Sequence, residues 1–226
     1  MPDAPFPRPL AEAIREAVKL SESLKFPRAP NDFTVEGAYT IGADGNISCD
    51  ERPVSFPYIS PVDALRTDLR KRGKDVRFVT PADDSRDALA ISMARKVRGE
   101  TYRVTIDNDC TFCVFRFAML KELLHIHFGI FGPSPSLEAV SETLRDAIQS
   151  RMSVNPDLSG EAFCYAVAIE IMIPYGPFRD AVLDHKKRNE TDHTIARMTR
   201  VPLPVIKFFF DDKYAELSGL LHRSIF

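Results

Sequence analysis

The segment RFAMLKELLH, residues 116–125, decides how this chain is interpreted. Residues four apart on a helix lie on one face, and Lys121 and His125 have this spacing. Two histidines at this spacing can bind one zinc ion, and a glutamate directly after the first can take a proton from the metal-bound water. The segment retains Glu122 and His125 but has Lys121 in place of the first histidine. It therefore predicts a metal-site helix with one ligand replaced.

A later segment, EAFCYAVAIEIMIP at residues 161–174, is predicted to form a helix that Pro174 ends. Glu161 stands at its start, and the small residues Ala162, Ala166 and Ala168 permit close packing against a neighbour. A third zinc ligand in such sites comes from a later helix. Glu161 is therefore a candidate ligand beside His125.

Together the two segments resemble the ImmA/IrrE family of metallopeptidases. Residues 116–125 are similar to the RFxxAHELGH segment of that family, and residues 161–174 are similar to its ExxC…AxEILMP helix. The predicted strand 102–106 and the segment 195–202 also resemble family elements. The resemblance extends over residues 61–214 and is strongest in residues 102–206.

The resemblance implies an α+β, zincin-like fold, with a small sheet packed on the metal-site helix and a helical C-terminal part. It also implies zinc as the cofactor, His125 and Glu161 as ligands, and Glu122 as the general base. Family members commonly cleave or otherwise relieve a helix-turn-helix repressor, in mobile elements or stress responses. A protein partner of this kind is expected, with a role in transcription regulation.

Lys121 departs from the family pattern, and its chemistry changes the expectation. A charged ammonium has three donors and no lone pair, so it cannot ligate zinc unless it is deprotonated. His125 and Glu161 alone would make a poor catalytic zinc site, which normally has three protein ligands. We predict that Lys121 pairs with Glu161 near His125, that zinc is absent or weakly bound, and that Glu122 is a vestigial base.

Three functions are compatible with these residues. The leading interpretation is an inactive pseudopeptidase that binds a regulatory protein partner. The first alternative is an active metal-dependent endopeptidase that cleaves a helix-turn-helix repressor, with neutral Lys121 or an outside group completing the coordination. The second alternative is a DNA-binding regulator, with residues 191–210 as a helix-turn-helix. Its second helix would contain Phe208, Phe209 and Phe210, which favour burial over contact with DNA.

Composition limits the class of protein, its affinity for nucleic acid and its expected location. The chain has 226 residues, 44% hydrophobic and 27% charged, which is typical of a globular protein. Its formal charge of −2 creates no general attraction for nucleic acid, so such binding would need a local patch. No apolar run approaches the length of a membrane span, and the N-terminus lacks a signal-peptide core, so a cytoplasmic location without membrane contact is expected. The oligomeric state is left open.

Two parts are expected along the chain: residues 1–60 as an accessory segment, and residues 61–226 as the zincin-like domain. A hairpin turn is predicted at residues 43–46. The predicted elements are helices at residues 10–24, 62–71, 112–128, 137–152, 161–173, 177–186, 191–199 and 204–211, a last turn or two near the C-terminus, and strands at residues 76–79 and 102–106.

The remaining cysteines and histidines could have metal or redox roles, but core or surface positions are expected for them. Cys110 and Cys113 have the CxxC spacing of zinc and redox pairs at a helix start, but without a second pair they are interpreted as half-buried residues. Cys164 is expected in the core. His127 lies two residues from His125 and so on another helix face. Surface positions are expected for His185, His193 and His222.

Overall fold

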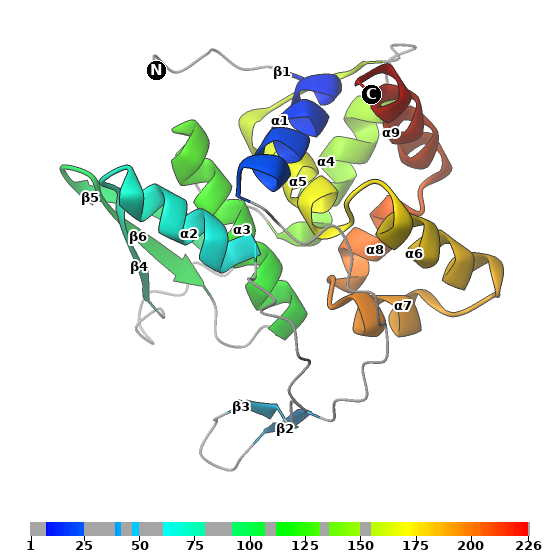
Figure 1. Cartoon of the computed structure of the whole chain (residues 1–226), viewed down its shortest axis with the longest axis horizontal. Coiled ribbons are helices and arrows are strands. Elements are labelled where there is room, and N and C mark those ends of the chain that lie inside the picture. Colours follow the sequence, from blue (N-terminus) through cyan, green and yellow to red (C-terminus); the bar gives the residue numbers. More distant parts are fainter. Residues whose placement is uncertain are drawn as a thin grey trace.

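The structure is a computed structural model that describes residues 8–24, 39–41, 47–49, 61–79, 92–106, 112–131, 136–149 and 155–225. It combines helices with small sheets in an α+β arrangement (Figure 1). The helices are α1 (Leu10–Ser23), α2 (Pro61–Lys71), α3 (Phe112–Phe128), α4 (Leu137–Gln149), α5 (Gly160–Met172), α6 (Pro177–Lys187), α7 (Asp192–Thr199), α8 (Leu203–Phe209) and α9 (Asp212–Ile225). The strands are β1 (Arg8–Pro9), β2 (Tyr39–Ile41), β3 (Ile47–Cys49), β4 (Asp75–Val79), β5 (Ser92–Arg98), β6 (Thr101–Ile106) and β7 (Asp157–Leu158).

The largest sheet has three strands in the order β4-β6-β5, with β4 parallel and β5 antiparallel to the central β6. Side chains alternate along β6, where Tyr102, Val104 and Ile106 are buried and Arg103 is exposed. This alternation gives the sheet one apolar face, as a half-buried strand requires. Helices α2 and α3 pack against the sheet (Figure 1), and this packing brings α3 beside β5 and β6.

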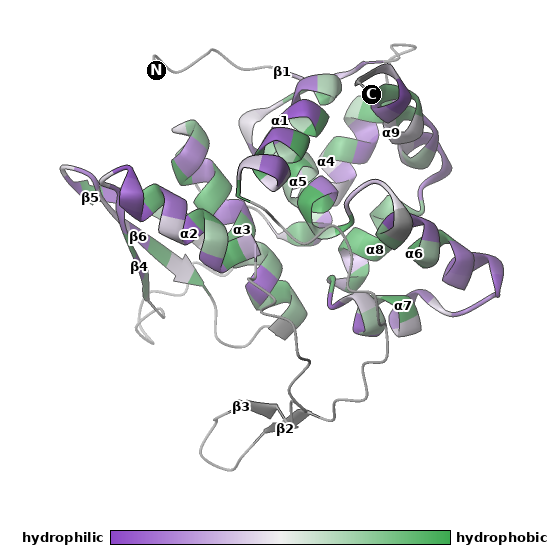
Figure 2. Ribbon diagram, viewed as in Figure 1, coloured by the Kyte–Doolittle hydropathy of each residue, from purple (hydrophilic) through white to green (hydrophobic). Residues whose placement is uncertain are grey.

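Helix α5 is the centre of the helical part. Every residue from Ala162 to Met172 is buried, and Figure 2 shows this helix hydrophobic over most of its length. A helix that is apolar on all sides must be surrounded by protein, and α1, α3 and α4 all pack against it. Ser159 caps its start by accepting a hydrogen bond from the Ala162 N–H, and the helix ends before Pro174.

Helix α1 shares the core with α5 although it lies far from it in sequence. Leu10, Ile14 and Ala17 are buried in the common hydrophobic cluster. The start of α1 is fixed by the pairing of β1 with β7 and by a 2.8 Å hydrogen bond from the Ala11 N–H to Asn155 Oδ1. Within residues 1–60, α1 therefore contributes directly to the core of the helical part.

Most predicted elements are confirmed within the described residues. Strands β1, β5 and β7 were not predicted, and α9 is a helix of 14 residues where only a turn or two was expected. The predicted helix 137–152 is α4, described over Leu137–Gln149, and residues 150–152 lie outside the described residues. Ser136 Oγ caps its start by accepting a 3.2 Å hydrogen bond from the Ala139 N–H. Strands β2 and β3 pair as a hairpin, while its predicted turn lies outside the described residues.

No helix in the described part of the chain is both long enough and apolar enough to cross a membrane. This finding agrees with the absence of a long apolar run in the sequence.

Candidate functional site

Helix α3 presents three of the four predicted site residues from its buried side. Lys121, Glu122 and His125 are 1%, 0% and 2% exposed, respectively. Lys121 and His125 are one turn apart, so both reach toward the start of α5. The end of α3 is set by Gly129, whose φ of 73° suits glycine, and the Ile130 N–H closes the last turn on the His125 carbonyl at 2.8 Å.

The fourth residue, Glu161, lies in the first turn of α5 and meets both side chains of α3. Lys121 Nζ donates a hydrogen bond to Glu161 Oε1, and His125 Nε2 lies 2.9 Å from Glu161 Oε2. Lys121 Nζ also lies 3.2 Å from Glu122 Oε1. The ammonium thus sits between two carboxylates and beside the histidine. The structure brings all four predicted site residues together, including the predicted contact between Lys121 and Glu161.

Sequence reasoning missed one residue of this cluster and understated another. Ser92 of β5 is 4% exposed, and its Oγ donates a 2.7 Å hydrogen bond to Glu122 Oε1. Cys164, expected in the core, is 0% exposed. It also lies close enough to His125 to raise the pKa of the imidazole. Cys164 follows Glu161 by three residues, so helix periodicity could have placed it here. Ser92 carried no such signal because its strand was not predicted.

The charges of the cluster support one another. Burial lowers the pKa of Lys121, but the negative charges of Glu122 and Glu161 outweigh it and hold the pKa above its usual value. Burial likewise opposes protonation of His125, but its interactions with Cys164, Glu161 and Glu122 raise the pKa to about 10. Burial raises the pKa of Glu161, yet contacts with His125 and Lys121 lower it to about 2. Near neutral pH, Lys121 and His125 are therefore cations paired with ionised Glu161.

This donor set does not fit a catalytic zinc ion. Lys121 offers an ammonium without a lone pair, so His125 and Glu161 are the two predicted ligands that remain. A catalytic zinc site uses three protein ligands and an open position. Among the described residues, no group of three or more His, Cys, Asp or Glu side chains is arranged to hold a metal ion.

His127 does not join this cluster. Burial and the charge of Arg72 lower its pKa to about 4, which places its ring near the end of α2. Its ring contacts Phe128 edge to face, with 4.8 Å between centroids. The expectation that His127 occupies another face of the helix is therefore confirmed.

The structure describes one cysteine of the CxxC pair. Cys113 is a half-buried free thiol in the first turn of α3. The interpretation of Cys113 as a half-buried residue is therefore confirmed, and burial raises the pKa of its thiol. Cys110 lies outside the described residues.

A second polar cluster surrounds Glu170, near the other end of α5, and it corrects the prediction for His222. His222 was expected at the surface, but it is 1% exposed and its Nε2 lies 2.7 Å from Glu170 Oε2. Its ring also stacks on that of Tyr175, with 4.4 Å between centroids. The polar sequence around His222 belongs to α9, and this helix places His222 against a buried carboxylate.

The other two histidines that were expected at the surface differ in exposure. His193 is exposed, and His185 is half-buried, with Nδ1 2.7 Å from Glu190 Oε1.

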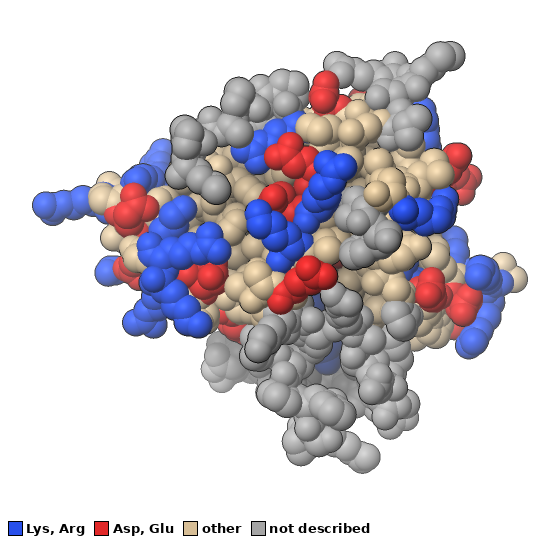
Figure 3. Space-filling view, turned by 45° about the horizontal axis from the view of Figure 1, so that its top comes forward, with Lys and Arg blue, Asp and Glu red and all other residues tan. Residues whose placement is uncertain are grey.

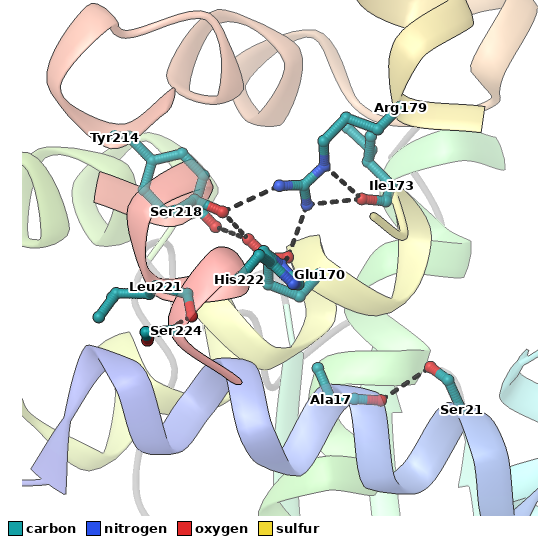
Figure 4. A network of polar contacts seen from close by, with 10 residues as sticks. All are labelled: Ala17, Ser21, Glu170, Ile173, Arg179, Tyr214, Ser218, Leu221, His222 and Ser224. Atoms are coloured by element: carbon teal, nitrogen blue, oxygen red, sulfur yellow. Dashed lines mark hydrogen bonds and ion pairs between the residues drawn. The ribbon is translucent and has the colours of Figure 1, made fainter. Parts of the chain in front are cut away.

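Glu170 accepts hydrogen bonds from both α6 and α9 (Figure 4). Arg179 Nη2 donates to Oε2 at 2.5 Å, while Tyr214 Oη and Ser218 Oγ donate to Oε1 at 2.7 and 2.8 Å. Arg179 also donates to the Ile173 carbonyl and to Ser218 Oγ. Burial raises the pKa of Glu170, but Arg179, His222 and Tyr214 lower it to about 2. The cluster ties three helices together around one ionised carboxylate.

Helices α7 and α8 have the succession expected for a helix-turn-helix, with Arg200 in a left-handed conformation between them. The second helix does not face outward, because Val205, Ile206, Phe208 and Phe209 are buried. A recognition helix must expose side chains to the groove. The predicted burial of this segment is therefore confirmed.

Comparisons of the chain with protein-family models, with characterised proteins and with solved structures gave no match.

Proposed function

We propose that this protein is a degenerate, zincin-like member of the ImmA/IrrE type that has lost hydrolysis and binds a protein partner. The partner class is a helix-turn-helix repressor or a similar regulator, met in the cytoplasm. The observation that carries the proposal is the buried Lys121 ammonium, which contacts Glu161 and lies beside His125. In the related enzymes a zinc ion would join the residues at these positions.

The surroundings of the cluster support this interpretation. The small sheet packs on α3, and Glu161 comes from a separate later helix, as the zincin-like arrangement requires. Lys121 supplies one positive charge between Glu122 and Glu161, so it can replace part of the electrostatic role of the ion. The ammonium thus compensates the buried carboxylates without offering a coordination position.

Loss of hydrolysis follows from the contacts of Glu122. A general base must reach a water or substrate proton at hydrogen-bond distance. Glu122 is 0% exposed and accepts a hydrogen bond from Ser92 Oγ, with the Lys121 ammonium 3.2 Å away. Its carboxylate is engaged in the cluster rather than presented to a substrate. Binding of a partner, without cleavage, is then the remaining role of the fold.

An active metal-dependent endopeptidase is the second candidate, because three of the four family-type residues still converge. Glu122, His125 and Glu161 lie together at one site, and Lys121 alone departs from the pattern. Activity would require Lys121 to lose its proton or to swing away. The raised pKa of Lys121 opposes the first of these routes.

The two candidates are separated by the fate of a repressor incubated with the protein. A helix-turn-helix repressor encoded beside the gene is the substrate of choice, with zinc added, and intact mass spectrometry follows both chains. The pseudopeptidase forms a complex in which the repressor keeps its full mass. Cleavage that is abolished in Glu122→Gln would establish the enzyme instead. Failure of every neighbouring repressor to bind or be cleaved would reject both.

A further inference from the structure

Basic residues are concentrated in the part of the molecule formed by α2 and the three-stranded sheet. Residues 61–79 and 92–106 hold ten Lys or Arg against four Asp or Glu, a formal charge of +6 in a chain whose total is −2. Figure 3 shows basic side chains gathered at the left end of the molecule, where Figure 1 places α2 and the sheet. The low net charge of the chain therefore conceals a strongly basic region.

Three arginines of this region lie in one row across the sheet. The strand register pairs Arg77 of β4 with Arg103 of β6, and Arg103 with Arg95 of β5. Paired residues point to the same face, and strands lie about 4.8 Å apart, so the row spans about 10 Å. All three arginines are exposed, on the face opposite to the buried Val104.

This row is electrostatically unfavourable in the isolated protein. Like charges directly opposite each other on neighbouring strands destabilise a sheet. Arg77 Nε has one partner, Asp75 Oδ2 at 3.0 Å, and both side chains are exposed. Neither Arg95 nor Arg103 makes an ion pair or hydrogen bond through its side chain with another described residue. An anion bound along the row would relieve this repulsion.

A hollow beside the row extends the basic surface toward α2. It has a volume of about 220 Å³ and lies between α2 and β4. Arg77 belongs to both the row and the hollow, so the two are continuous. The Arg66 guanidinium, which donates to the Val76 carbonyl at 3.3 Å, is held against β4. The hollow is lined by Arg66, Arg70, Asp75, Val76 and Arg77.

We infer that this arginine row and hollow bind the phosphate backbone of duplex nucleic acid without reading its sequence. Guanidinium groups match phosphates with paired hydrogen bonds, and phosphate contacts carry no base specificity. The row of about 10 Å is comparable to the width of the major groove, about 12 Å, so its ends can reach phosphates on opposite strands. This surface is separate from the Lys121 cluster and does not depend on the function proposed for it.

The composition of this face favours nucleic acid over an acidic protein. Protein interfaces have an apolar core enriched in aromatic residues. Among the residues of these strands whose side chains are described, Val97 is the one large apolar residue that is exposed. A polyphosphate needs only the guanidinium groups, so the surface matches its chemistry more closely.

Fluorescence anisotropy with a short labelled duplex tests the inference. The full chain is compared with the triple variant Arg77→Gln, Arg95→Gln, Arg103→Gln, and with a control triple variant at exposed arginines of the helical part, Arg188→Gln, Arg197→Gln, Arg223→Gln. Both variants change the net charge equally. We expect the row variant to bind about 100-fold more weakly at about 0.1 M salt, with a salt slope lower by about 3. The control should stay within about threefold of the unchanged protein.

A second readout checks that the row variant folds and that the row is repulsive. Removing like charges should raise its thermal midpoint at low salt, and added salt should remove this gain. Equal weakening by both triple variants, or no duplex binding by the unchanged chain, overturns the inference. It is also overturned if polyglutamate or vesicles of anionic lipid bind through the row while the duplex does not. Single substitutions that each lower the salt slope by about 1 would support it.

Discussion

Helix α5 carries two ionised carboxylates, Glu161, which is partly exposed, and Glu170, which is buried. Glu161, in its first turn, contacts Lys121 and His125 of α3, and its side chain remains 19% exposed. Glu170, nine residues further along, has a side chain only 1% exposed and is held by Arg179 and other donors from α6 and α9. Both carboxylates have pKa values lowered to about 2 by neighbouring donors and cations.

The different burial of the two carboxylates indicates different roles, with Glu170 serving stability and Glu161 belonging to the candidate site. Both oxygens of Glu170 accept hydrogen bonds from rigidly packed helices, so this carboxylate acts as a structural junction. Glu161 instead retains contact with solvent and is paired with the buried Lys121 ammonium. The Glu161 end of α5 therefore faces solvent, while the Glu170 end is closed. The Glu170 cluster should therefore dominate stability, and the Lys121 cluster should be more tolerant of substitution.

Glu170→Gln should produce the largest loss of stability. Removing the charge leaves the Arg179 guanidinium buried without its counter-ion, at a cost of about 4 kcal/mol in the free energy of unfolding. Urea denaturation followed by circular dichroism measures it. Glu216→Gln, an exposed position on α9, is the control and should change the value by less than about 0.5 kcal/mol. A loss below about 1 kcal/mol for Glu170→Gln would show that the cluster does not hold these helices.

Lys121→Met should cost less, about 2 to 3 kcal/mol. The substitution keeps the apolar stem but removes the ammonium between Glu122 and Glu161, while His125 still balances Glu161. Adding Glu161→Gln to Lys121→Met should restore part of the loss, because the positive charge of His125 then balances one carboxylate, Glu122, instead of two. Lys207→Met, at an exposed position of α8, serves as the control. A Lys121→Met variant as stable as its control would contradict a charge role for the ammonium.

Stability should fall in alkaline solution because of His125. Its folded pKa of about 10 lies above the unfolded value of 6.5, so its contribution is complete below pH 6.5 and is lost as the pH rises through 10. Glu161 contributes fully above pH 4.5 and loses its contribution as the pH falls through about 2. We expect a loss of about 2 kcal/mol between pH 6.5 and 9.

The variant His125→Gln tests whether His125 causes the alkaline loss of stability. Unfolding measured across the same pH range should show a flatter profile for the variant than for the unchanged chain. The Glu170 cluster does not produce an alkaline loss of this kind, since the pKa of its carboxylate is displaced downward. An identical alkaline decline in both proteins would exclude His125 as its cause.

Ser92→Ala should have the smallest effect, about 1.5 kcal/mol, because it removes one buried hydrogen bond to Glu122. A double-mutant cycle with Glu122→Gln should give a coupling of about 1 kcal/mol. In a variant that combines Ser92→Ala with Ser218→Ala of the Glu170 cluster, the two losses of unfolding free energy should add within about 0.5 kcal/mol. Strong coupling between Ser92 and Ser218 would mean that the two clusters act as one.

Local patterns made most of the fold predictable. The apolar stripes of α1 and α4 and the alternation of β6 are properties of neighbouring residues, so the sequence displays them directly. The contact of Lys121 with Glu161 was predicted because residues 116–125 and 161–174 resemble two segments that share one metal ion, with Lys121 at a ligand position. Helix spacing alone placed only Lys121 and His125 on one face.

Features that depend on long-range packing were not predictable. Strand β5 reads Ser-Met-Ala-Arg-Lys-Val-Arg, and its charged residues conceal the alternation that the sheet imposes. Glu170 meets Arg179, Tyr214 and His222 only because α6 and α9 fold back onto α5. The polar neighbours of His222 suggested exposure, whereas the docking of α9 buries it. The arginine row likewise depends on strand register.

Zinc content tests most directly whether the Lys121 ammonium has replaced a metal ion. The unchanged chain and Lys121→His are purified without chelators, mixed with equimolar zinc, desalted and analysed by atomic emission. We predict that the unchanged chain retains no stoichiometric zinc, while Lys121→His retains about one ion per chain because it restores three ligands. Stoichiometric zinc in the unchanged chain would contradict the replacement, and its absence from both proteins would show that the site no longer has the geometry of a zinc centre.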